Sequence, residues 1–359
     1  DNTTPNTETN VEDVKIVLVA VSSATTTIAD ITNSDGTLKV TNTNETPEGG
    51  KLYYIAVAVD KDGKPLATQG GDVTINYGTT STTSDKDATA GVDYDNTIKV
   101  NTKVGVVFEV KTKDDYYAEG DENFTVKITD LKNSPYETPS IDTTKDTVTS
   151  TIKDNAPTIN GTVVSGGEDT DGNTYGAEDT VYAIITGETT VNEGGEVTYT
   201  VELVDKDGNP VTVTKDTNVT VKFEGTGDKQ ASLDDIKGFL DSNNSPITIS
   251  ADNKVVVTIP NGKSEINFTV ETKDDYIADN NEQYKLTIAD VVKTGEFENV
   301  QYDGKYPTNS EFTSKVPNAT NNVDTTIIDN SDPKNPGGED GGYGEEDTVY
   351  AVITGTQII

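Results

Sequence analysis

Carboxylate side chains gather in short runs that recur along this chain. The run Thr112-Lys-Asp-Asp-Tyr116 is followed within a few residues by Glu119 and Glu122, and Thr272-Lys-Asp-Asp-Tyr276 repeats it. Calcium binds about six to eight oxygen atoms, which must converge from separate loops. Adjacent carboxylates without a cation are costly, because each raises the pKa of its neighbour. The runs therefore favour a calcium site, with a solvated acidic surface as the alternative.

The composition limits the other chemistry that is available. The 359 residues carry 63 acidic side chains against 27 basic ones, all of them Lys, for a formal net charge of -36. Cys, His, Met and Trp are absent. Thiolate and imidazole ligands are therefore excluded, and oxygen ligands select hard cations such as calcium. The excess of negative charge argues against nucleic acid, and against insertion into a membrane or binding to an anionic one.

Paired carboxylates can also hydrolyse glycosides, and Asp114 with Asp115 is the pair to consider. Such sites stack the sugar on aromatic side chains, and this sequence has no Trp to do so. We therefore expect the protein not to be an enzyme.

The chain repeats itself at the scale of a domain. Residues 178–187 read EDTVYAIITG, and residues 346–355 read EDTVYAVITG, 168 positions later. A weaker copy begins at Glu12. Further matches follow in the same order: Glu48-Gly-Gly with Glu193-Gly-Gly, Asp60-Lys-Asp-Gly63 with Asp205-Lys-Asp-Gly208, and Thr151-Ile-Lys-Asp-Asn155 with Thr326-Ile-Ile-Asp-Asn330. A period of this length indicates a tandem array of domains.

Gly- and Pro-rich acidic tracts between the copies predict the domain limits. These are a first repeat over 11–155, a linker over 156–177, a second repeat over 178–330, a linker over 331–345 and the first strand of a third repeat over 346–359. No run of about 18 apolar residues and no leader sequence is present. Since the chain starts at Asp1 and stops within an apolar run, we expect it to be a piece of a longer protein.

Short runs rich in Val, Ile, Thr and Tyr alternate apolar and polar residues, which is typical of half-buried strands. Turn sequences such as Lys61-Asp-Gly63 separate several of them. The pattern predicts an all-β fold of tandem antiparallel β-sandwiches. The runs are 52–59, 106–110, 124–128, 197–203, 266–270 and 284–288.

Residues 232–240 depart from this pattern. Leu233, Ile236 and Leu240 fall on one face of a helix, and Ser232 with Asp235 resembles a capping box. The second repeat is therefore expected to contain a short helical insertion.

The first repeat resembles a Calx-beta domain. The resemblance rests on Asp87-Ala-Thr-Ala-Gly-Val-Asp-Tyr94, on the acidic pair in Thr112-Lys-Asp-Asp-Tyr116 with Asp121-Glu-Asn-Phe124 after it, and on Thr151-Ile-Lys-Asp-Asn155. It covers most of 48–155 and, more loosely, 193–330. It implies an immunoglobulin-like sandwich that binds calcium ions at one tip.

The resemblance also implies a set of calcium-binding carboxylates in each repeat. In the first they are Glu48, Asp87, Asp114, Asp115, Glu119, Glu122 and Asp154. In the second they are Glu193, Asp228, Asp274, Asp275, Asp279, Glu282 and Asp329. Because the second repeat has Ser232-Leu-Asp-Asp235 in place of the family's Gly-x-Asp-Tyr, we expect it to bind fewer or weaker ions. In the linker, Asp169 and Asp171 resemble the start of an EF-hand loop, with a plain turn as the alternative.

Tandem β-sandwiches with acidic tips are suited to an extended stalk. They resemble the extender regions of large secreted bacterial adhesins of the RTX type, which implies a monomeric spacer at the cell surface that contacts mainly its neighbouring repeats and serves attachment or biofilm formation. One alternative is an adhesive module that binds a glycan or a protein through its loops. Another is a calcium-sensing domain, the role of similar domains in sodium-calcium exchangers.

Overall fold

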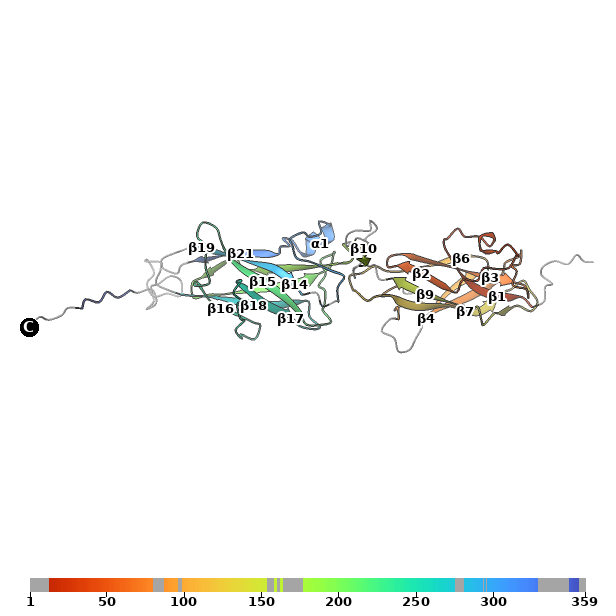
Figure 1. The fold of residues 1–359 in the computed structure, drawn as a ribbon, viewed down its shortest axis with the longest axis horizontal. Coiled ribbons are helices and arrows are strands. Elements are labelled where there is room, and N and C mark those ends of the chain that lie inside the picture. The colour runs from red at the N-terminus through yellow and green to blue at the C-terminus, as the bar shows by residue number, and fades with distance from the viewer. Residues whose placement is uncertain are drawn as a thin grey trace, which may run out of the picture. The chain divides into compact units, whose positions relative to one another are not determined.

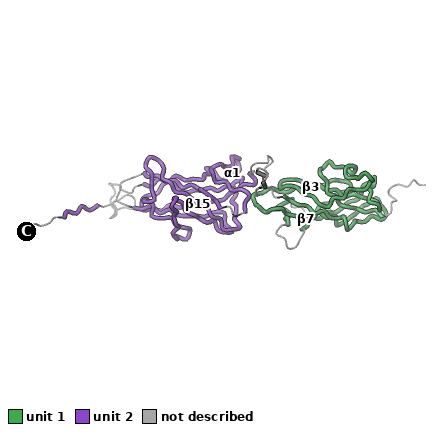
Figure 2. The backbone as a smooth tube through the Cα atoms, viewed as in Figure 1, with its two compact units in different colours: residues 1–174 green, residues 175–359 purple. Residues whose placement is uncertain are grey.

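Two compact units make up the chain in this computed structural model, residues 1–174 and residues 175–359 (Figure 2). Nearly all of their regular secondary structure is β-strand, which confirms the predicted all-β fold class (Figure 1). Within the part of the chain that the structure describes, no helix has the length and apolar character needed to cross a bilayer. The described residues are 13–79, 87–95, 99–153, 158–159, 162–163, 177–274, 281–292, 294, 296–328 and 349–354.

Unit 1 is a sandwich of two sheets. The first sheet has the order β6-β3-β1-β8, with β1 at Lys15–Val21, β3 at Lys51–Val59, β6 at Val107–Lys111 and β8 at Ser140–Ile141. The second has the order β2-β9-β7-β4-β5, with β2 at Thr43–Pro47, β4 at Asp72–Thr79, β5 at Lys99–Lys103, β7 at Glu122–Lys132 and β9 at Thr147–Lys153. A short ladder of β10 (Thr158–Ile159) and β11 (Thr162–Val163) lies in the segment predicted as a linker.

Unit 2 has the same two layers. Its first sheet has the order β16-β18-β14-β12-β20, with β12 at Thr180–Gly187, β14 at Glu196–Val204, β16 at Ile236–Leu240, β18 at Glu265–Thr272 and β20 at Asn299–Gln301. Its second has the order β13-β21-β19-β15-β17, with β13 at Thr190–Asn192, β15 at Thr217–Thr226, β17 at Lys254–Ile259, β19 at Glu282–Val291 and β21 at Asn322–Ile328.

The two units share one pattern of strand pairing. In each, the first strand pairs antiparallel with the third, β1 with β3 and β12 with β14. In each, the second strand pairs in parallel with the last, β2 with β9 and β13 with β21. A β-bulge lies at corresponding points of the two units, with the extra residue Thr129 of β7 opposite Thr74–Ile75 and the extra residue Ala289 of β19 opposite Thr220–Val221. Two facing sheets paired in this way form the predicted immunoglobulin-like sandwich.

The first strand of unit 1 is apolar on both faces. Ile16 and Leu18 belong to the core between the two sheets, whereas Val17 and Val19 belong to a second buried cluster. Ile31, in the short 3₁₀ helix η2 (Ala29–Ile31), packs into this second cluster. The segment 22–42 therefore covers the outer face of the sheet.

Unit 2 covers the corresponding face with a different segment. Only two residues separate β12 from β13, so nothing like 22–42 is present there. Helix α1 (Ser310–Lys315) instead places Phe312 against Tyr182 and Ile184. Asn309 caps this helix, since its side-chain oxygen accepts a hydrogen bond of 2.8 Å from the Phe312 N–H. No alternating or helical pattern in the sequence predicted this helix.

The helix predicted at 232–240 is wrong, because Ile236–Leu240 is strand β16, paired with β18. A register shift between Ile236 and Gly238 inserts an extra residue, so Ile236 and Phe239 are both buried although they are three positions apart. This bulge reproduces helical spacing. The Asp235 carboxylate does bind the N–H and hydroxyl of Ser232, at 2.6 and 3.0 Å, but these bonds close a turn before the strand.

Replacing Phe239 by Ala should lower the free energy of unfolding of unit 2 by about 3–5 kcal/mol. Phe239 is 1% exposed and packs edge-on against Phe223, with ring centroids 6.4 Å apart. Leu240→Ala is the matched control and should cost less than about 1.5 kcal/mol, because Leu240 is only half-buried. Urea denaturation measures both values. A helix at 232–240 would reverse their order.

Residues 349–354 do not form the strand predicted to open a third repeat over 346–359. Val349, Tyr350, Val352 and Ile353 are between 73% and 97% exposed. The nearly identical β12 is held between β14 and β20. Among the described residues no strand is paired with 349–354, and a strand requires partners for its backbone groups.

Candidate metal centre

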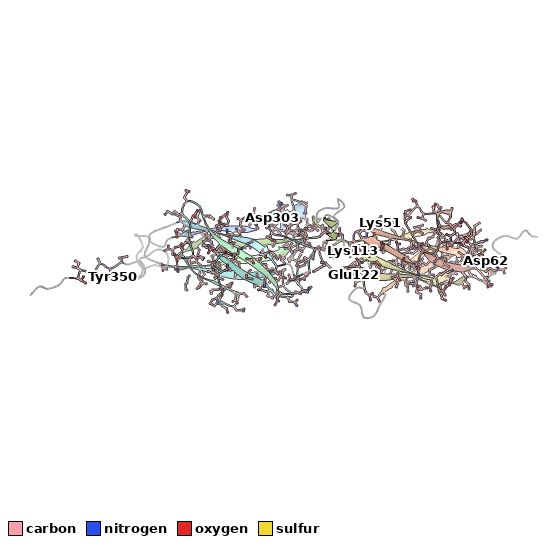
Figure 3. The ribbon with its side chains drawn as sticks, in the orientation of Figure 1. Lys51, Asp62, Lys113, Glu122, Asp303 and Tyr350 are labelled. Carbon is pink, nitrogen blue, oxygen red and sulfur yellow. The ribbon has the colours of Figure 1, made fainter. Side chains whose placement is uncertain are left out.

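Three loops meet at one end of unit 1. They are the turn 48–50 between β2 and β3, the segment 87–95 before β5, and the segment 112–121 between β6 and β7. Figure 3 labels Lys113 and Glu122 at this end and Asp62 at the opposite end of the unit.

The turn 89–93 fixes the position of Asp93. Its N–H donates to the Thr89 carbonyl at 3.0 Å, and its carboxylate accepts the N–H of Thr89. Gly91 allows the turn with a φ of 87°, which favours glycine. The next residue, Tyr94, stacks on Phe124 in the core, with ring centroids 4.4 Å apart. The turn is thereby anchored, and Asp93 is 7% exposed.

The loop after β6 is bound to both of the other loops. The Thr112 hydroxyl lies 3.1 Å from the carbonyl of Pro47, at the end of β2, and 3.2 Å from the carbonyl of Gly50, in the turn 48–50. The Lys113 N–H donates to the Asp93 carbonyl at 2.9 Å. Further along, the Asp115 carboxylate accepts the Tyr117 N–H at 2.8 Å. Backbone bonds therefore hold the loops together independently of any ion.

Carboxylate oxygens of Asp93, Asp115 and Glu119 lie within 4.8 Å of one another. Glu122, the first residue of β7, is 7% exposed and shares a hydrogen bond with Asp93. Four acidic side chains from two loops and one strand thus converge.

The concentration of negative charge changes the protonation of Glu122. Burial, together with the nearby carboxylates of Asp93, Glu119 and Asp115, raises the pKa of this carboxyl from 4.5 to about 8. In the metal-free protein Glu122 therefore keeps its proton at pH 7. A bound divalent cation would favour the ionised form instead.

This arrangement is suited to a hard divalent cation. All of its donors are oxygens, and they come from chain segments that the backbone already holds together. Four carboxylates supply most of a calcium coordination shell. The chain has no Cys or His to provide a nucleophile or an imidazole base.

Of the carboxylates predicted for the first repeat, Asp115, Glu119 and Glu122 lie together here. Asp93 completes the group, although it was not among the predicted ligands. Its sequence signal was Gly91-Val-Asp-Tyr94, a single acid in a turn motif rather than a run of acids.

Three other predicted residues lie on the adjoining turns. Asp114 contacts Gly49, where a Cβ atom would lie 3.3 Å from the Asp114 Cβ. The Glu48 N–H donates to the Lys153 carbonyl at 3.1 Å. Asp87 forms a parallel bridge with Asn123. Among the described residues these three are outside the group that lies within 4.8 Å.

Unit 2 repeats the scaffold of this end. The carbonyl of Asp235 accepts the Lys273 N–H at 2.9 Å, so Asp235 corresponds to Asp93. Asp274 contacts Gly194 as Asp114 contacts Gly49. Glu282 begins β19 as Glu122 begins β7, but it is only half-buried. The N–H of Glu193 donates to the Ile328 carbonyl at 3.0 Å, which matches the bond made by Glu48.

Asp228 does not occupy the position equivalent to Asp87. Gln230 does, since it bridges Gln283 in parallel as Asp87 bridges Asn123. Asp228 lies two residues earlier and is exposed. The sequence match aligned two charges, whereas the strand pairing aligns a carboxylate with a neutral amide. Among the described residues of unit 2, the position that corresponds to Asp87 therefore carries a neutral amide.

Six predicted ligands lie outside the described residues. They are Asp154, Asp169, Asp171, Asp275, Asp279 and Asp329.

Comparison with known proteins gives one family match. A family model described as the LapA domain matches residues 239–314, which run from β16 through helix α1. The comparison with curated proteins finds no match.

Solved structures similar to the chain include calcium-binding domains and an adhesin. The apo-form Calx CBD1 domain is 16% identical, with 42% of this chain and 96% of that one covered and a TM-score of 0.26. The calcium binding domain CBD12 of CALX1.1 is 12% identical, covering 80% and 97%, with a TM-score of 0.24. The Yersinia pseudotuberculosis adhesin InvE is 14% identical, covering 84% and 60%, with a TM-score of 0.24. Scores of this size do not establish a common fold, so the fold rests on the strand pairing above.

Proposed function

We propose that the chain is a pair of calcium-stabilised spacer repeats from a secreted bacterial surface adhesin. The observation that carries the proposal is the convergence of Asp93, Asp115, Glu119 and Glu122 at one end of unit 1. The LapA domain match supports the assignment to an adhesin. The net charge of -36 supports a metal-bound state, because that charge opposes compaction unless cations reduce it.

Calcium suits the site better than magnesium does. Calcium accepts six to eight oxygens in flexible geometry, whereas magnesium requires a near-octahedral shell and keeps several of its waters. A site made of several carboxylates on loops matches the first description. At the cell exterior, an affinity in the range of about 10⁻⁴ to 10⁻³ M is sufficient, as in other extracellular modules.

A spacer role follows from the repeated architecture. Each unit has its own core and the same strand pairing, so copies can be joined in series without new contacts. In this proposal the repeats hold an adhesive region away from the cell for attachment or biofilm formation. The carboxylates of the linkers and of the second repeat, including Asp169, Asp171 and Asp275, would add ions that restrict motion between units.

Calcium should therefore raise the melting temperature of the complete chain. With a dissociation constant of about 10⁻⁴ M, calcium at 10 mM adds about 2.7 kcal/mol to the stability of the unit that binds it. For a unit of this size the melting temperature then rises by about 5–10 °C. Calorimetry with calcium, with magnesium and with a chelator measures this, and magnesium should have the smaller effect.

Small-angle scattering completes the test. Chelation should broaden the distribution of interatomic distances if ions restrict motion between the units. Identical melting temperatures and identical scattering in calcium and in chelator would overturn the proposal.

A further inference from the structure

A buried pair of hydroxyl groups joins the two sheets of each unit at the same position. In unit 1 the Tyr54 hydroxyl, on β3, lies 2.6 Å from the Ser150 hydroxyl, on β9. In unit 2 the Tyr199 hydroxyl, on β14, lies 2.6 Å from the Thr325 hydroxyl, on β21. All four residues are at most 1% exposed. Each pair therefore connects the third strand of the unit along the chain, which lies in one sheet, to the last strand of the sandwich, which lies in the other sheet.

Unit 2 extends the pair into a chain of hydrogen bonds. The Thr325 hydroxyl donates to the Glu188 carbonyl at 3.0 Å, so its only proton is used there. Tyr199 must then donate to Thr325, and Tyr284 donates to Tyr199 at 2.7 Å. Glu188 lies between β12 and β13, so the last strand is also bound to the opening segment of the unit.

The rings of the two tyrosines would pack equally well without their hydroxyls. Tyr54 stacks on Phe108 and Tyr199 stacks on Phe268, each with centroids 5.5 Å apart. Phenylalanine in either place would keep this ring packing without burying a hydroxyl group of its own. The buried hydroxyl is thus an addition whose effect lies in the bond that it makes across the core.

The strand directions define how a pull on the chain passes through a unit. The Leu18 N–H, on β1, bonds to the Lys145 carbonyl, and the Thr149 N–H, on β9, bonds to the Asn42 carbonyl just before β2. The opening strands and the last strand therefore run side by side in one direction. The chain enters at one end of unit 1 and leaves at the other. The bonds from Ile185 to Thr320 and from Thr326 to Thr189 repeat this in unit 2.

A pull on both ends of a unit then slides the last strand along its parallel neighbour. In unit 1 this ladder is formed by residues Thr43–Pro47 of β2 and Thr149–Lys153 of β9. Hydrogen bonds across a parallel ladder are evenly spaced and run at a slant from one strand to the other. The pulling force is therefore shared by all the hydrogen bonds of the ladder. In a hairpin that is pulled apart from its end, by contrast, the bonds break one after another.

We infer that the buried hydroxyl pair and the parallel ladder beside it together form a latch that resists a pulling force in each unit. In unit 1 the latch is the Tyr54–Ser150 pair with the β2–β9 ladder, and in unit 2 it is the Tyr199–Thr325 pair with the β13–β21 ladder. The inference rests on the proposed spacer function, since a spacer between a cell and a surface is pulled along its chain. The latch holds the last strand in place from two sides, through its own sheet and through the sheet opposite. Resistance to forced unfolding depends on the unfolding rate, which such contacts control.

Single-molecule force spectroscopy of the complete chain, held in excess calcium between reference modules, tests the latch. Tyr54→Phe should make unit 1 unfold about tenfold faster at a given force, because one buried hydrogen bond is lost and Ser150 is left unsatisfied. Unit 2 should be unchanged, and Tyr199→Phe should have the opposite selectivity. Tyr53→Phe, which removes a half-buried hydroxyl from the neighbouring residue, should leave both units unchanged.

Two controls separate the latch from ordinary loss of stability. Ile75→Val trims a fully buried core residue on β4, away from the pulled strands, and lowers chemical stability by a comparable amount. The latch requires Tyr54→Phe to accelerate forced unfolding several-fold more than Ile75→Val does, and equal acceleration would overturn it. Tyr54→Phe should also keep the calcium-induced rise in melting temperature. Absence of that rise in the unaltered chain would refute the calcium proposal and leave the force comparison valid.

Discussion

Replacing Asp115 by Asn is expected to weaken calcium binding at the end of unit 1 by roughly 10- to 100-fold. The change keeps the size of the side chain and removes one charge from a group whose oxygens lie within 4.8 Å of one another. Calcium titration of the complete chain, followed through the backbone amide signals of Asp93 and Tyr117, reports this site separately from any in unit 2. Asp93→Asn should weaken binding to a similar degree, although the sequence did not single it out.

Asp62→Asn is the matched control for this experiment. Asp62 is exposed, pairs with Lys61 at 2.8 Å, and lies at the end of unit 1 opposite Glu122 (Figure 3). It should leave calcium affinity unchanged. If Asp115→Asn and Asp62→Asn gave the same affinity as the unaltered chain, the group around Asp93 would not be a calcium site.

The stability of metal-free unit 1 is expected to fall as the pH rises from 5 to 8. The pKa of Glu122 is raised from 4.5 to about 8 in the folded protein. Between these pH values the folded state keeps the Glu122 proton, whereas the unfolded state has already released it. Wherever the folded state binds more protons, stability decreases with pH. In chelator, the melting temperature of unit 1 should drop by at least about 5 °C across this window.

Calcium and one substitution should each remove this dependence. A bound cation stabilises ionised Glu122, so the decrease should disappear in calcium, and binding near pH 7 should release a proton. Glu122→Gln has no carboxyl to titrate and should flatten the profile in chelator. Glu109→Gln, which changes an exposed residue of β6 beside Lys51, is the control and should retain the dependence. A flat profile for the unaltered metal-free chain would contradict the assignment.

Much of the sandwich could be predicted from local sequence because strand alternation survives in the fold. The runs at 124–128 and 284–288 became the buried halves of β7 and β19, and both kept their alternation. Alternation is a short-range signal, however. It cannot report a bulge, so Leu233, Ile236 and Leu240 indicated one face of a helix although an extra residue interrupts strand β16 between Ile236 and Gly238. The segments that cover the outer faces, 22–42 and helix α1, are placed by contacts with residues of the sheets that lie far away in the sequence.

The candidate site was predictable in part for the same reason. Asp115 and Glu119 stand in a conspicuous acidic run, but Asp93 is a single acid whose position near them depends on the turn 89–93 and on the bond from the Lys113 N–H to its carbonyl. The mismatch of Asp228 with Asp87 has a similar origin. The shared negative charge suggested that Asp228 aligns with Asp87. The pairing with β19 instead aligns Gln230 with Asp87. Distances between loops are a product of the folded sheets and cannot be obtained from spacing along the chain.

The parallel pairing of the last strand with the second has a further consequence in an array of similar units. Neither sandwich is closed until its final strand docks, so a neighbour's final strand is a potential intruder during folding. Ser150 faces Tyr54 in a core where the residue corresponding to Tyr284 is Phe124, whereas Thr325 takes part in the three-hydroxyl chain of unit 2. A final strand exchanged from unit 2 into unit 1 would bring the extra methyl group of Thr325 into a core that has Ser150 at that position. The side chain at this one position therefore distinguishes each unit's own final strand from its neighbour's.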